Sequence, residues 1–150
     1  MRGRRGLATV GLALIASLAC PVAAGAAVSA LSKKAYIKAA DDLCRQSDLL
    51  INELAEQHFG ALPQGQDPTE EQLQAYTEEA EPVLRQLVDG VRALPRPKGD
   101  KKKLKKIYNL VEDAVDAVAE DPALFLGDEN PFAKADKAAR KYGFKVCGSN

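Results

Sequence analysis

Lys101-Lys-Lys-Leu-Lys-Lys-Ile-Tyr-Asn-Leu-Val-Glu-Asp-Ala-Val-Asp-Ala-Val-Ala-Glu120 combines helical periodicity with an unusual order of charges. Its cations all come first and its anions all come last, whereas a helix favours anions near its N-terminus and cations near its C-terminus. Apolar residues recur three and four positions apart, which predicts an amphipathic helix. These residues are Leu104, Ile107, Tyr108, Val111, Ala114, Val115 and Val118.

Two longer segments earlier in the chain have the same periodicity. The first spans about residues 34–58. The second spans about residues 68–94, with Asp67 as the expected N-cap and Pro68 at the first helical position. The apolar stripe of the first segment consists of Tyr36, Ile37, Ala40, Leu43, Cys44, Leu50, Ile51 and Leu54.

A fourth, shorter helix is expected near the C-terminus. It would start at Asn130-Pro131 and end at Gly143, a glycine C-cap followed by the apolar Phe144. Asp100 is the expected N-cap of the 101–120 helix, and no segment alternates as a strand does. Four amphipathic helices with short links predict an all-α, up-down-up-down four-helix bundle over residues 31–150, with a short fourth helix.

This topology would sort the charges between the two ends of the bundle. One end would collect the starts of the first and third helices and the ends of the second and fourth, with 14 basic and 4 acidic residues, a net charge of +10. The remainder would hold 4 basic and 17 acidic residues. The reversed charges of the 101–120 helix therefore match the end on which they lie. The predicted anion-contacting residues of this basic end are Lys98, Lys101, Lys102, Lys103, Lys105, Lys106, Arg140 and Lys141.

Residues 1–30 have the layout of a signal peptide or a membrane anchor. A basic start is followed by an apolar run from Leu7 to Ala19 and then by small residues, which is typical of a secretory signal. Ser17-Leu18-Ala19-Cys20 also resembles an imperfect lipobox, so Cys20 is a candidate lipidation site. A retained anchor is the third interpretation, because residues 6–32 carry no charge. All three interpretations imply that the chain leaves the cytoplasm.

Without Arg2, Arg4 and Arg5, the 21 basic residues of the chain become 18 against 21 acidic ones, a net charge of −3. This balance argues against nucleic acid as a partner, because nucleic-acid-binding domains are usually strongly basic. A basic end on such a chain can still attract anions locally, since clustered charge produces a focused potential.

Two cysteines, Cys44 and Cys147, remain once the first thirty residues are removed. An even pair in an exported chain predicts a disulfide, which would tie the first helix to the C-terminus. The alternative is a pair of free, buried thiols.

The charge layout leads to two hypotheses on function. The first is an exported, non-enzymatic cell-envelope protein whose basic end faces an anionic membrane surface or an envelope polyanion, with the acidic end left for an unknown protein partner. The second is an interaction protein that self-associates head to tail, basic end against acidic end, in a salt-sensitive manner.

The inventory of catalytic residues is small. His58 is the only histidine, it lies at the end of the first stripe, and no nucleophile partner is evident. The chain has no haem-attachment motif, no zinc-protease motif and no EF-hand spacing. We therefore expect no enzymatic activity, no metal and no cofactor.

Three short stretches resemble a known group of proteins. They are Tyr36-Ile-Lys-Ala-Ala-Asp-Asp-Leu-Cys44, Leu94-Pro-Arg-Pro97 and Ala138-Ala-Arg-Lys-Tyr-Gly-Phe-Lys-Val-Cys-Gly148. Small exported helical proteins of actinobacteria, many of them classed as lipoproteins, have a similar Tyr-x-x-x-Ala-Asp-x-x-Cys opening and a similar Tyr-Gly-x-x-x-Cys-Gly close. The resemblance implies export and a Cys44–Cys147 pair, and it carries over no catalytic residue.

Overall fold

A computed structural model describes residues 29–127 and 129–149, and Cys20 and the rest of the N-terminal segment lie outside this part of the chain. The described residues form four α-helices and one short 3-10 helix, with no strand among them. The prediction of an all-α chain with four helices, the fourth of them short, is confirmed. The elements are α1 (Lys33–Phe59), α2 (Glu70–Ala93), α3 (Lys101–Glu120), η1 (Pro122–Leu126) and α4 (Ala133–Tyr142).

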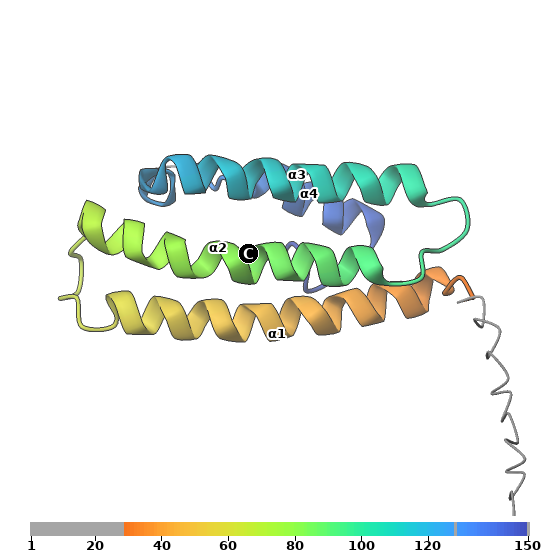
Figure 1. Cartoon of the computed structure of the whole chain (residues 1–150), viewed down its shortest axis with the longest axis horizontal. Coiled ribbons are helices and arrows are strands. Elements are labelled where there is room, and N and C mark those ends of the chain that lie inside the picture. Colours follow the sequence, from red (N-terminus) through yellow and green to blue (C-terminus); the bar gives the residue numbers. More distant parts are fainter. Residues whose placement is uncertain (1–28, 128, 150) are drawn as a thin grey trace, which may run out of the picture.

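Three long helices, α1, α2 and α3, lie side by side, and each runs in the direction opposite to the one before it (Figure 1). The contacts between α2 and α3 follow this arrangement. Arg92, near the end of α2, donates to Glu112 at 2.8 Å, and Arg85, two turns earlier, donates to Asp116 at 2.8 Å. The residue numbers rise along α2 as they fall along α3, as antiparallel helices require.

The short helix α4 packs closely on α3, and the closest neighbour of α1 is α2. The Tyr142 hydroxyl at the end of α4 donates to Asp100 at 2.9 Å, just before α3 begins. The disulfide between Cys44 and Cys147 then joins α1 to the segment that follows α4, with the two Cα atoms 5.4 Å apart. The predicted disulfide is therefore present, and it links α1 covalently to the segment after α4.

Two of the predicted helix starts are wrong. Thr69 is the N-cap of α2 rather than Asp67, because Thr69 and Gln72 form a reciprocal capping box, and α4 begins at Ala133 rather than at Asn130-Pro131. The predicted position of Asp100 as N-cap of α3 is confirmed, but its carboxylate makes no capping hydrogen bond. It accepts from Tyr142 instead, so a tertiary contact has replaced the local one.

The predicted end of α4 has the geometry of a glycine C-cap. Gly143 has φ of 119°, a conformation that other residues rarely adopt. The N–H groups of Gly143 and Phe144 both donate to the carbonyl of Ala139, and the Phe144 ring is buried. This turn directs the chain after α4 back towards α1.

Most of the core lies between α1, α2, α3 and the end of α4. Tyr36 and Leu104 are fully buried there. Leu50, which the sequence placed on the buried stripe of the first helix, is 49% exposed. The covered face of α1 is therefore narrower near Leu50 than its apolar stripe. The other members of the cluster around Tyr36 and Leu104 are Ala40, Val88, Val91, Ile107, Tyr108, Ala139, Tyr142 and Phe144.

None of the helices that the structure describes is both long enough and apolar enough to cross a membrane.

Candidate functional site

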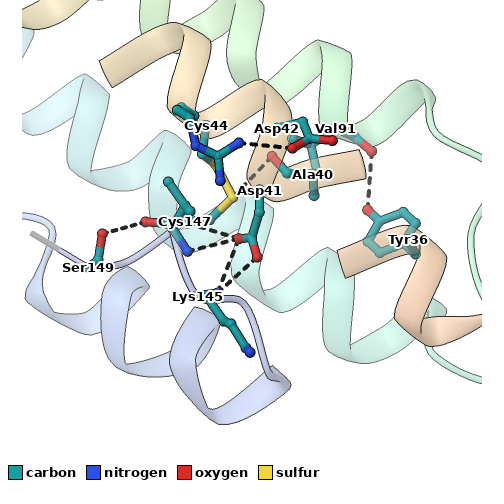
Figure 2. The surroundings of a disulfide bond; sticks show 11 residues. Tyr36, Ala40, Asp41, Asp42, Cys44, Val91, Lys145, Cys147 and Ser149 are labelled. Atoms are coloured by element: carbon teal, nitrogen blue, oxygen red, sulfur yellow. Dashed lines mark hydrogen bonds and ion pairs between the residues drawn. A yellow bond between two sulfur atoms is a disulfide. The ribbon is translucent and has the colours of Figure 1, made fainter. Parts of the chain in front are cut away.

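The segment after α4 is held against α1 by one buried carboxylate as well as by the disulfide. Asp41 is 7% exposed, and its carboxylate accepts hydrogen bonds from the backbone N–H groups of Lys145, Val146 and Cys147 at 3.0–3.2 Å (Figure 2). Asp41 precedes Cys44 by three residues, so both side chains lie on one face of α1. We call Asp41, Cys44 and the chain from Lys145 to Gly148 the tail clamp.

Three tyrosines join the helices next to the tail clamp. The Tyr36 hydroxyl donates to the carbonyl of Val91 at 3.1 Å and is also hydrogen-bonded to the Tyr108 hydroxyl. The Tyr142 ring meets the Tyr36 ring edge to face at 6.5 Å. Burial raises the pKa of Tyr36 and of Tyr142 above the ordinary tyrosine value, and the hydrogen bond to Asp100 raises the pKa of Tyr142 further. Both hydroxyls therefore stay protonated and act as structural donors.

The eight residues predicted to contact anions are all exposed. They come from the 94–100 link, the first two turns of α3 and the last turn of α4. The hydrogen bond from Tyr142 to Asp100 places the last turn of α4, with Arg140 and Lys141, beside the start of α3. Two of the eight have partners within the described chain. Lys103 lies 3.4 Å from Asp100, and Arg140 donates to the carbonyl of Gly148.

The other six make no ion pair in the part of the chain that the structure describes. They are Lys98, Lys101, Lys102, Lys105, Lys106 and Lys141.

A cavity of about 560 Å³ lies among all four helices, a volume in the range of small-molecule sites. Its lining comes from α1, α2, α3, η1, the chain leading into α4, α4 itself and the tail clamp. Most of the lining side chains are apolar, among them Ile51, Leu84, Ile107, Val111 and Phe125. The disulfide lies in the wall, so the tail clamp helps to build this cavity.

Polar groups in the lining come from α1 on one side and from α4 and the residues before it on the other. Ser47 is 6% exposed, and its hydroxyl has no hydrogen-bond partner among the described residues. Asp136 is 8% exposed and accepts one long hydrogen bond, from the Asn130 amide at 3.4 Å. Asp48 also lines the cavity. The lining of the cavity is thus mostly apolar and includes a few side chains that can accept hydrogen bonds.

Burial has a clear electrostatic effect on the two aspartates. It raises the pKa of Asp136, although the nearby charge of Arg140 and the hydrogen bond from Asn130 act in the opposite direction. It also raises the pKa of Asp48, against a smaller opposing effect of Arg45. Neither carboxylate forms an ion pair in the described part of the chain. Each would therefore gain from a cation placed beside it.

Sequence reasoning missed these cavity residues, although one signal was available. Ala40, Cys44, Ser47 and Ile51 follow a four-three-four spacing, so Ser47 occupies a position on the buried stripe of α1. Asp136 lies three residues before the buried Ala139 on α4, so the two share one side of the helix. A polar residue in register with an apolar stripe is the pattern that indicates a lined cavity or a buried hydrogen bond.

His58, the one candidate for acid–base chemistry in the sequence, has Nε2 3.3 Å from a carboxylate oxygen of Glu79 and lies beside the Tyr76 ring. It is not part of the cavity lining. Among residues 29–127 and 129–149, no group of three or more His, Cys, Asp or Glu side chains is arranged to hold a metal ion.

Comparisons with protein-family models, with curated proteins and with solved structures found no match for this chain.

Proposed function

We propose that this chain is an exported, non-enzymatic protein of the cell envelope. In this proposal an up-down-up-down four-helix bundle presents its basic end to an anionic membrane surface or an envelope polyanion. The observation that carries the proposal is the set of six exposed lysines that form no ion pair with any described residue, all located in the 94–100 link, at the start of α3 or at the end of α4. An unpaired lysine near an anionic surface contributes about 1 kcal/mol of attraction.

Two further features support this function. The disulfide between Cys44 and Cys147 suits an oxidising compartment outside the cytoplasm. The first thirty residues have the layout of a signal peptide or an anchor, and they lead directly into α1. The start of α1 belongs to the basic end, because Lys33 lies over the Tyr142 ring with Nζ 4.4 Å from its centroid. A lipid or anchor on the N-terminal segment would therefore hold the basic end towards the membrane.

Co-sedimentation with lipid vesicles tests the proposal. We expect the purified, disulfide-bonded protein to bind vesicles that contain phosphatidylglycerol, to bind pure phosphatidylcholine vesicles weakly, and to dissociate as salt is added. The triple variant Lys102→Gln, Lys105→Gln, Lys106→Gln should bind at least about tenfold more weakly, because three attractive charges are lost.

The matched control is Arg45→Gln, Lys134→Gln, Lys137→Gln, which removes the same number of charges away from the basic end and should bind like the unmodified protein. Equal losses in the two triple variants would show that net charge rather than the basic end drives binding. Binding to inorganic polyphosphate without binding to vesicles would identify an envelope polyanion as the target.

Head-to-tail self-association is the alternative that the charge layout also allows. Sedimentation velocity in the absence of vesicles separates the two functions. Growth of the sedimentation coefficient with protein concentration at low salt, abolished at high salt, would favour self-association. A constant monomer would leave surface binding as the function of the basic end.

A further inference from the structure

The lining of the cavity among the four helices has an apolar part and a polar part, and each part restricts which ligands can bind. The apolar lining, with Leu84, Leu87, Ile107 and Val111 on α2 and α3, favours a hydrophobic body. The polar lining consists of side chains that accept hydrogen bonds, and it comes from α1, α4 and the residues before α4. A ligand that satisfies both linings is apolar for most of its length and carries one polar group.

Ser47 belongs to the lining, but its hydroxyl oxygen has almost no accessible surface and no hydrogen-bond partner among the described residues. The hydroxyl of Thr77 is buried in the same way, and Thr77 lies outside the lining. The carboxylates of the lining, rather than Ser47, are therefore the groups that a polar ligand group would meet.

The carboxylates decide the charge of the ligand. Asp136 is more than nine-tenths buried, Asp48 lies in the same lining, and no Lys or Arg pairs with either in the described chain. Arg140, one turn after Asp136 on α4, donates to the carbonyl of Gly148 instead. The exposed Glu129 adds a third carboxylate where the cavity meets the surface. An anionic ligand would be repelled here, whereas an ammonium group would pair with Asp136.

We propose that this cavity binds a small apolar molecule that carries a single amine, with the ammonium group hydrogen-bonded to Asp136 and the apolar body among Leu84, Ile107 and Val111. Asp48 adds a second favourable charge near the same group. This site is independent of the basic end, which attracts molecules of the opposite charge, so either function can fail without the other.

Three fluorescent probes with the same ring system test the charge requirement. They are aminomethyl-anthracene, hydroxymethyl-anthracene and anthracene carboxylate, titrated separately into the purified, disulfide-bonded protein at neutral pH. We expect the amine to bind at least about tenfold more tightly than the alcohol, a factor in the range of a hydrogen bond to a charged group, and the carboxylate to bind weakest. A carboxylate that binds as tightly as the amine would overturn the proposal.

Paired variants then locate the binding. Asp136→Asn should weaken amine binding at least about tenfold and leave alcohol binding almost unchanged, whereas Asp113→Asn, which removes one exposed carboxylate outside the lining, should change neither. Equal effects of these two variants on amine binding would mean that the probe binds elsewhere.

Leu84→Trp is the test that does not depend on charge. The larger side chain fills part of the cavity, so all three probes should bind more weakly, while far-UV circular dichroism confirms that the helices are retained. If Leu84→Trp folds and the amine still binds with unchanged affinity, the cavity is not the site and the proposal is wrong.

Discussion

At the scale of single residues, the contacts of Tyr36, Asp41 and Cys44 explain the spacing of these three residues at the start of α1. Tyr36 is fully buried and bonds to Val91 and Tyr108, Asp41 holds three backbone N–H groups of the tail, and Cys44 forms the disulfide. All three residues belong to the Tyr36–Cys44 stretch, which is similar to the opening motif of exported actinobacterial proteins, and all three have a structural role. The motif secures the C-terminal segment against α1.

Replacing Asp41 by Ala should lower the free energy of unfolding by about 3 kcal/mol, because three backbone donors lose a charged acceptor. Asp42→Ala is the matched control at the next position. Its ion pairs with Lys38 and Arg45 are exposed, so the loss should be much smaller. Urea unfolding of the two oxidised variants, followed by far-UV circular dichroism, measures both. Similar losses for the two variants would contradict the role assigned to the tail clamp.

At the scale of an element, α3 has charges that oppose its own dipole. Its first turn contains no acidic residue and its last turn no basic one. Asp100 makes no capping hydrogen bond to the backbone of α3, because its carboxylate accepts a hydrogen bond from the Tyr142 hydroxyl. What holds α3 in place is its buried face, where Leu104, Val115 and Val118 are almost completely buried. Hydrophobic burial outweighs a dipole effect that is worth only about 0.3–1 kcal/mol per charge.

Lys102→Glu should therefore raise the free energy of unfolding by about 0.3–1 kcal/mol, because it places an anion in the first turn of α3. Lys106→Glu makes the same charge change one turn later, where the dipole effect has faded, and should stabilise less. Urea unfolding at low ionic strength compares the two variants. Both should weaken binding to phosphatidylglycerol vesicles, since both reverse a charge at the basic end. A Lys102→Glu variant no more stable than Lys106→Glu would show that the helix dipole is not the cause.

At the scale of the whole molecule, the disulfide and Asp41 close the chain on itself. Residues 44 and 147 are separated by 103 positions, so the bond removes a large amount of conformational freedom from the unfolded chain. The same bond lies in the wall of the cavity. The tail clamp therefore links the stability of the molecule to the shape of its cavity.

The double variant Cys44→Ser, Cys147→Ser should lose about 4–5 kcal/mol of stability, the value of the chain-entropy model for a loop of this length. Binding of aminomethyl-anthracene should weaken in the same variant, because the tail no longer fixes one wall. Ser149→Ala, which removes only the 2.8 Å hydrogen bond to the carbonyl of Val146, serves as the control in the tail. Guanidinium unfolding and the probe titration measure the two effects. Unchanged stability in the double variant would contradict this account.

The sequence by itself determined the number and approximate extent of the helices, because apolar periodicity, prolines and the Gly143 cap act locally. It also predicted the disulfide, since the expectation of an exported chain makes a pair of cysteines a predicted disulfide. Only the tertiary structure decided which polar residues on the buried stripes matter. Asp41, Ser47 and Asp136 look alike as polar interruptions of an apolar pattern. Asp41 meets backbone donors from a segment more than a hundred residues away, whereas Ser47 and Asp136 face a cavity. The physical reason is that periodicity identifies the buried face of a helix, whereas the partners on that face come from other elements and depend on how the helices pack.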